Sequence, residues 1–148
     1  MDFKVFTKEI EAMRAYWHSL RDLQMEIDKI EHEEQGVKAI RYDREPTTPN
    51  PNAEQFRLEL IEKKAELEKM VDRTLLKYNP IKASVIDTLE KLSEKTREIL
   101  CEKYGLVYQR FEHSTVAIFK EEQTYEELNE RYHYSNLWRH IKSEVEKL

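Results

Sequence analysis

The sequence contains few of the residues that interrupt regular structure. Among 148 residues there are two glycines, four prolines and one cysteine. The scarcity of glycine and proline favours long helices over a protein of many short strands and turns. The lone Cys101 excludes an internal disulfide bond and fits a reducing compartment. No apolar run approaches the roughly 18 residues that a membrane span needs, and no signal peptide is expected at the start, so we predict a cytoplasmic protein without a membrane segment.

Charged residues make up 37% of the chain and hydrophobic residues 39%, with a net charge of −5. This balance predicts an all-α fold in which long helices carry narrow apolar stripes. Proteins that bind nucleic acids usually present a basic face, because contacts to phosphates supply much of their affinity. The acidic balance therefore counts against strong non-specific binding, but a local basic patch is compatible with it.

Two long helices are expected in the N-terminal half, over residues 3–33 and 52–78. The first has apolar residues at alternating spacings of four and three, namely Phe6, Ile10, Met13, Trp17 and Leu20. This spacing is typical of a coiled coil or a helical hairpin. The connector 34–52 contains Gly36, Pro46, Pro49 and Pro51, which interrupt helices. We predict that residues 1–78 form an antiparallel helical hairpin whose surplus apolar face pairs two copies of the chain into a dimer.

The second predicted domain covers residues 80–148. Asn79–Pro80 predicts a break, because a residue before proline is disfavoured in a helix. Further helices are expected over 81–92 and from the N-cap Ser93 to Tyr104, where Gly105 ends the second of them. Residues 105–122 contain β-branched and aromatic residues that fit a strand pair, an irregular helix or a loop, and we favour a helix because the neighbouring segments are helical.

The segment from Thr124 to Leu148 contains two short helical patterns separated at His133–Tyr134. Ser135 is the predicted N-cap of the second pattern. That pattern has an apolar stripe made of Leu137, Ile141, Val145 and Leu148. Two short helices joined by a tight turn are the outline of a helix-turn-helix, whose second helix can lie in the major groove of DNA.

A local excess of positive charge accompanies the second of these helices. Residues 131–143 contain two arginines, one lysine and no acid. Asparagine and arginine side chains can read adenine and guanine edges, and serine and lysine can hold phosphates. The predicted DNA-binding residues are Arg131, Ser135, Asn136, Arg139, His140, Lys142 and Ser143. The same pattern also fits an ordinary amphipathic helix with a polar outer face.

Metal-binding and catalytic patterns are absent from the sequence. None of the five histidines stands at a metal-ligand spacing from another histidine or from Cys101. There is no glycine-rich phosphate loop and no supported Ser/His/Asp or Cys/His arrangement. We therefore expect no metal, no cofactor and no enzymatic activity.

The order of these features resembles the small phage transcriptional regulators of the ArpU and RinA type, whose last segment is similar to the helix-turn-helix of sigma-factor region 4. The matching motifs are Leu89–Leu92, Arg97–Leu100, Lys103–Tyr104, Thr124–Leu128 and Tyr134–Ser135. The chain departs from that pattern in the long link 105–122 and in Asn129, where a small residue is common. The resemblance implies double-stranded DNA as a partner in a bacterial host cell.

Two functions follow from these patterns. The first is sequence-specific DNA binding that regulates transcription. The resemblance implies that the regulated genes belong to a phage or prophage and that RNA polymerase or another phage or host protein is a further partner. The alternative is a coiled-coil adaptor or inhibitor that binds a protein and not DNA. The acidic balance and the long heptad pattern favour the alternative, whereas the local basic excess favours the first.

Overall fold

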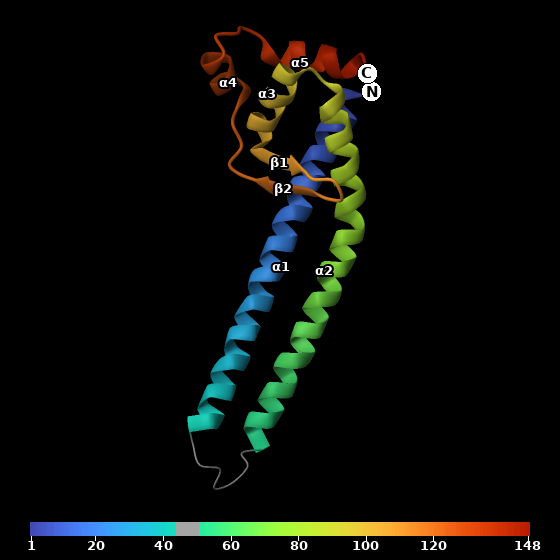
Figure 1. Cartoon of the computed structure of the whole chain (residues 1–148). Coiled ribbons are helices and arrows are strands. Elements are labelled where there is room, and N and C mark those ends of the chain that lie inside the picture. Colours follow the sequence, from blue (N-terminus) through green and yellow to red (C-terminus); the bar gives the residue numbers. More distant parts are fainter. Residues whose placement is uncertain (44–50) are drawn as a thin grey trace. The chain divides into compact units, whose positions relative to one another are not determined.

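A computed structural model describes residues 1–43 and 51–148, and most of these residues are helical (Figure 1). The elements in chain order are α1 (Phe3–Asp43), α2 (Pro51–Lys91), α3 (Glu94–Tyr104), β1 (Leu106–Arg110), β2 (Thr115–Phe119), α4 (Tyr125–Arg131) and α5 (Leu137–Glu146). The chain forms two compact units, His18–Lys77 and a second unit that combines Met1–Trp17 with Tyr78–Leu148. The predicted helical class is confirmed, but the all-α prediction missed the two strands.

Helix α1 continues ten residues beyond the predicted end at residue 33. Gly36 lies inside the helix and does not end it, so the predicted stop at this residue is wrong. A glycine inside a helix costs only about 1 kcal/mol relative to alanine, which a long helix tolerates. The predicted connector 34–52 is therefore wrong for residues 34–43, which belong to α1, and for residues 51 and 52, which belong to α2. Its Pro46 and Pro49 lie outside the described residues.

Helix α2 runs through Pro80 without a break, so the predicted boundary at Asn79–Pro80 and the separate helix over 81–92 are wrong. Proline lacks the N–H that would bond to the carbonyl of Leu76, four residues earlier. Leu76, Asn79 and Pro80 are all exposed, so water can reach this side of the helix. Tyr78 and Val85, on either side of the proline, are buried and hold the helix in place.

In the unit His18–Lys77, α1 and α2 pack against each other through a small apolar core. Its buried members are Ile27 and Ile30 from α1 and Leu60 and Leu67 from α2, with Leu23 and Val71 at its margin. An ion pair between Lys64 Nζ and Glu31 Oε1 at 3.1 Å joins the same two helices. The helices of this unit thus form a pair with a narrow contact stripe.

The other unit has the larger core, built from the start of α1, the end of α2 and all later elements. Its fully buried side chains are Phe6, Ile10, Met13, Val85, Ile86, Leu89, Ile99, Leu100, Leu128, Leu137, Ile141 and Val145. Ser93 caps α3 as predicted, since its hydroxyl accepts a hydrogen bond from Thr96 N. Gly105 ends α3 in a left-handed conformation, with φ of 67°, also as predicted.

The predicted helix over residues 105–122 is wrong, because β1 and β2 form an antiparallel hairpin there. Val107 pairs with Ile118 and Tyr108 with Ala117 in the register of the two strands. Leu106, Ala117 and Phe119 are buried and Tyr108 is half-buried, whereas the residues that alternate with them, Val107, Gln109, Val116 and Ile118, are exposed. This alternation has the period of two that defines a strand with one buried face.

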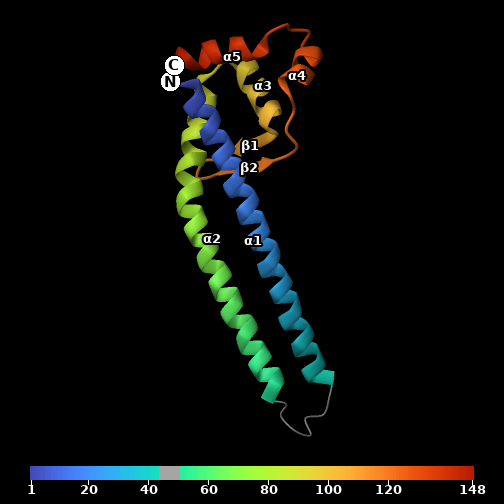
Figure 2. The same cartoon turned by 180° about the vertical axis from the view of Figure 1, so that it is seen from behind.

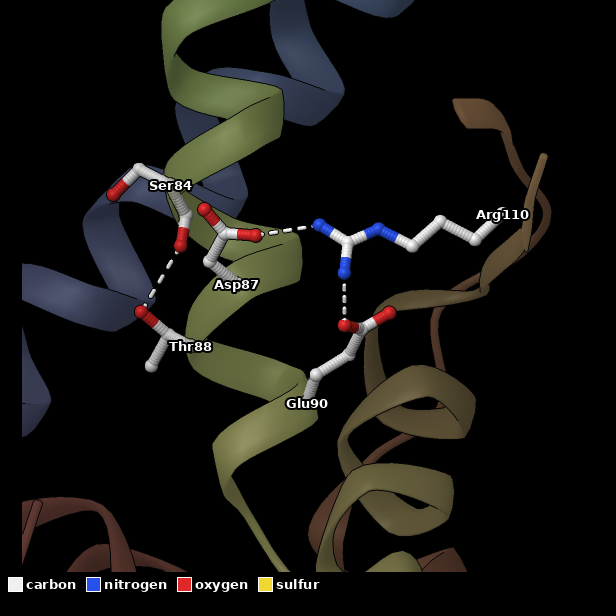
Figure 3. A network of polar contacts seen from close by, with 5 residues as sticks. All are labelled: Ser84, Asp87, Thr88, Glu90 and Arg110. Carbon is white, nitrogen blue, oxygen red and sulfur yellow. Dashed lines mark hydrogen bonds and ion pairs between the residues drawn. The ribbon is translucent and has the colours of Figure 1, made fainter. Parts of the chain in front are cut away.

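One face of the hairpin meets α1, and the other faces away from it (Figure 1 and Figure 2). The Phe119 ring lies 5.9 Å from the Trp17 ring, and the Arg14 guanidinium lies 5.9 Å from the Phe119 centroid. Arg110, near the tip of the hairpin, forms ion pairs with two acids of α2. Its guanidinium lies 2.6 Å from the Asp87 carboxylate and also pairs with Glu90 (Figure 3). The hairpin is therefore held in place by α1 and α2.

Candidate nucleic-acid interface

The two C-terminal helices are joined by a tight turn, Tyr132–Asn136. Thr124 caps α4, because its hydroxyl accepts a hydrogen bond from Glu127 N at 3.2 Å. After α4, His133 takes a left-handed conformation with φ of 51°, and Tyr134 N donates to the Asn129 carbonyl at 3.0 Å. A left-handed residue at a helix end reverses the chain while the last carbonyls keep their hydrogen bonds. The turn that separates α4 from α5 is therefore sharply defined.

Helix α5 begins one residue later than predicted, with Asn136 and not Ser135 as its N-cap. Neither side chain caps the helix, and the Asn129 Oδ1 of α4 accepts the hydrogen bond from Leu137 N at 3.2 Å instead. Because the partner comes from eight residues earlier, a local capping rule could not identify it. Asn129 thus connects the two helices directly.

One stripe of α5 is buried and fixes the helix in the unit. Leu137, Ile141 and Val145 are at most 1% exposed. The predicted fourth member, Leu148, is 44% exposed and follows the helix. The buried stripe determines which side chains face solvent on the opposite side, and these include Asn136, Arg139 and Ser143.

Arg139, Lys142 and Ser143 also line an open hollow of about 450 Å³ on the surface of α5, together with Trp138, Glu146 and Lys147. The Lys142 ammonium lies 5.1 Å from the centroid of the Trp138 ring, and the Phe3 ring meets the same indole edge-on at 6.0 Å. Lys147 and Trp138 were not among the predicted site residues, although both fall on this surface. Three cations and one carboxylate make the hollow electropositive.

The remaining predicted residues lie apart from this hollow. His140 is on the opposite flank of α5, where its ring lies 5.9 Å from the Tyr134 ring and its Nε2 lies 3.8 Å from the Glu144 carboxylate. Arg131 belongs to α4 and forms an ion pair with Glu102 of α3 at 3.1 Å. Ser135 is exposed in the turn. The structure therefore brings three of the seven predicted residues together in the hollow and distributes the others around it.

Glu144 is directed towards the start of α3 and not into the hollow. Its carboxylate accepts hydrogen bonds from Ser93 N at 2.7 Å and from the Thr96 hydroxyl. Burial alone would raise the pKa of Glu144, but the hydrogen bonds from Thr96 and Ser93 and the nearby His140 lower it on balance. A carboxylate at this position also interacts favourably with the positive end of the α3 dipole.

We predict that Glu144→Gln lowers the free energy of unfolding by about 1 kcal/mol at neutral pH, because the carboxylate caps α3 from a distance. A group whose pKa is lowered by folding stabilises the protein above its unfolded pKa and loses this effect as the pH falls. The difference between wild type and variant should therefore shrink below pH 4.5, the ordinary pKa of the group. Urea unfolding at several pH values measures the free energy of unfolding of both proteins. A difference between them that does not depend on pH would contradict the role of the charge.

A second cleft of about 630 Å³ lies between the start of α1 and helices α3 to α5. Its lining includes Tyr104, Tyr125 and Trp138, and the Lys103 ammonium lies 5.1 and 5.2 Å from the two tyrosine ring centroids. Burial raises the pKa of Tyr125 to about 12, and its hydroxyl has no hydrogen-bond partner among the described residues. Three lysines and three acids line this cleft, so its formal charges cancel.

Within residues 1–43 and 51–148, no group of three or more His, Cys, Asp or Glu side chains could hold a metal ion. No helix in this part of the chain combines the length and the hydropathy needed to cross a bilayer. Comparisons with protein-family models, with curated proteins and with solved structures found no match.

Proposed function

We propose that α4 and α5 form a helix-turn-helix that binds duplex DNA and regulates transcription, with α5 in the major groove. The observation that carries this proposal is the division of α5 into a buried and an exposed side. Three buried residues anchor the helix, and the opposite side presents Asn136, Arg139 and Ser143. In a helix-turn-helix, the residues near the start of the second helix contact base edges.

Each side chain on this surface has a chemical role in the proposal. Arg139 is exposed and suits a bidentate contact with guanine, and Asn136 suits adenine. Ser143, Lys142 and Lys147 can contact phosphates, which position the helix on the duplex. His140, Ser135 and Arg131 lie apart from the hollow, and in the proposal they contact the duplex only at its margin.

The electrostatics of α5 support this orientation. Of the two acids near its end, Glu144 is hydrogen-bonded to the start of α3 and so does not oppose DNA phosphates from the exposed face. Glu146 remains on the hollow beside the basic residues. With a net charge of −5, the protein would depend on base contacts more than on general attraction to DNA.

The test uses a duplex obtained from a random library by selection with the wild-type protein. We expect Arg139→Ala to weaken binding about 10-fold to 100-fold and to relax the preference at one base pair, because a bidentate base contact is lost. Lys142→Ala should weaken all sequences alike and reduce the salt slope by about one. Fluorescence anisotropy at a series of salt concentrations measures both quantities.

The matched control is Lys69→Ala with Arg73→Ala, which removes one lysine and one arginine from the exposed surface of α2. This control should change neither the affinity nor the salt slope beyond the effect of net charge. If the α5 variants behave like the control, or if the selection yields no bound duplex at low salt, then α5 does not bind DNA.

A second candidate function, a protein adaptor, is favoured by the apolar side chains of α2 that face solvent. Leu58, Ile61 and Leu76 are 60%, 44% and 77% exposed. Exposed apolar side chains at helical spacing are typical of a face that binds another helix. Stoichiometric co-purification with a phage or host protein, lost in Leu58→Gln with Leu76→Gln, would support the adaptor over the DNA-binding regulator.

A further inference from the structure

The cleft between the start of α1 and helices α3 to α5 lies wholly within the unit formed by Met1–Trp17 and Tyr78–Leu148. Its volume of about 630 Å³ is within the range of about 300–1,000 Å³ that is usual for sites of small organic molecules. Each helix that lines it is anchored by a side chain that is at most 1% exposed, namely Ile10, Leu100, Leu128 and Ile141. The walls of the cleft are therefore fixed by the core, and no ligand is needed to form them.

Four aromatic side chains line this cleft, namely Phe3, Tyr104, Tyr125 and Trp138. Phe3 and Tyr104 are buried, whereas Tyr125 is half-buried and Trp138 is partly exposed. Aromatic side chains bind planar apolar groups by stacked or edge-to-face contacts, and they are typical of the lining of small-molecule sites. The lining therefore suits a ligand with an aromatic body.

The cleft also carries charges of both signs that do not neutralise one another. Within the described part of the chain, no ion pair is formed by any of its six charged residues, which are Lys4, Lys103, Lys142, Asp2, Glu11 and Glu146. The ammonium groups of Lys103 and Lys142 lie over aromatic rings, at 5.1–5.2 Å from the ring centroids. Asp2 accepts a hydrogen bond from Lys4 N at 2.8 Å, so Glu11 and Glu146 are the carboxylates without a hydrogen-bond partner in the cleft.

Lys103 and Glu11 come from different helices but both lie near Tyr104. The Lys103 ammonium is 5.1 Å from the Tyr104 ring centroid. Burial, the neighbouring Tyr125 and then the charge of Glu11 raise the pKa of Tyr104. Phe3 and Trp138, whose rings are 6.0 Å apart, lie about two turns of α1 away from Glu11. The cleft thus has a charged region of both signs and an aromatic region.

We propose that this cleft binds a small zwitterion with an aromatic body, of which an amino acid with an aromatic side chain is the simplest kind. The carboxylate of the ligand pairs with Lys103, its ammonium pairs with Glu11, and its ring contacts Phe3 and Trp138. A ligand with one charge would leave either the lysine or the glutamate without a partner in the cleft, and this lowers its affinity.

The site is separate from the proposed contacts with DNA, so its occupation does not depend on them. Trp138 and Lys142 nevertheless line both the cleft and the hollow on α5. A bound ligand would therefore lie beside the surface that is proposed to bind the duplex.

A titration of the full chain with phenylalanine, in the Trp17→Phe variant and without DNA, tests the proposal. Trp138 is then the only tryptophan, and phenylalanine does not contribute to its emission. We expect a saturable change in emission with a dissociation constant in the millimolar range or below, as is usual for a ligand of this size. Phenethylamine, phenylpropionate and alanine, which lack the carboxylate, the ammonium and the ring respectively, should each bind about tenfold more weakly or not at all.

Two variants test the charged end of the site, and circular dichroism checks that they remain folded. Lys103→Gln and Glu11→Gln should each weaken the binding of phenylalanine about threefold to tenfold. The matched control is Lys8→Gln, because Lys8 is exposed on α1 and does not line the cleft. A titration without a saturable change would overturn the proposal. So would equal affinities for phenylalanine and its three analogues, or Lys103 and Glu11 variants that bind as tightly as the control.

Discussion

Gly105→Ala is expected to lower the free energy of unfolding by about 3 kcal/mol or more. Gly105 has φ of 67°, and a non-glycine residue in this region costs about 1–3 kcal/mol by itself. An added Cβ would also lie 2.4 Å from the Lys120 carbonyl oxygen and 2.6 Å from that of Glu121. These are backbone atoms and cannot rotate away, so the segment after β2 would have to move.

Denaturant unfolding of Gly105→Ala, followed by circular dichroism, measures this effect. Gly36→Ala is the matched control, because Gly36 lies in α1 and a Cβ there would meet no atom within 4 Å. The control should be neutral or more stable by about 0.5–1 kcal/mol, since alanine favours the helix. Equal losses in the two variants would contradict the steric explanation.

Phe6→Ala is expected to cost about 3–5 kcal/mol, the usual range for removing a fully buried phenylalanine ring. Phe6 is 0% exposed, and it belongs to the unit that Met1–Trp17 forms with Tyr78–Leu148. The neighbouring Val5 is 52% exposed, so Val5→Ala should change stability by less than about 0.5 kcal/mol. Thermal and urea unfolding of both variants provide the comparison.

The signal to follow is the unfolding of α5, reported by the fluorescence of Trp138. If Phe6→Ala destabilises α1 but leaves the transition near Trp138 unchanged, then the first residues do not contribute to the core around α5. Trp17→Phe removes the other tryptophan and makes this signal specific.

Local signals in the sequence predicted the capped ends of the short helices. Ser93 and Gly105 act on backbone groups within a few residues, so their effects can be read from the sequence. Gly36 and Pro80 misled the prediction because their local costs, about 1 and about 3 kcal/mol, do not by themselves end a long helix. The hairpin was missed because each strand has only five residues, too few for its alternation to outweigh helical surroundings.

The buried stripe of α5 could be predicted from its spacing, but the surroundings of the site could not. Asn129 caps α5 from α4, and Glu144 caps α3 from α5, across eight and 51 residues. Such contacts exist only when the helices are assembled. The position of the Lys142 ammonium over the Trp138 ring could not be predicted either, because this contact depends on the side-chain conformation and not on the spacing.

The larger unit is built from two segments that are far apart in the sequence, and this has a consequence for its folding during synthesis. The ribosome makes Met1–Trp17 before the partners of this segment, Tyr78–Leu148, which emerge only after the whole unit His18–Lys77. Because synthesis proceeds at about 5–20 residues per second, the apolar side chains of the first segment remain exposed for several seconds before their core can form. Contacts this distant in sequence also slow folding itself. The nascent chain is therefore expected to need protection from aggregation at its N-terminal helix, while the unit His18–Lys77 can pair as soon as it has emerged.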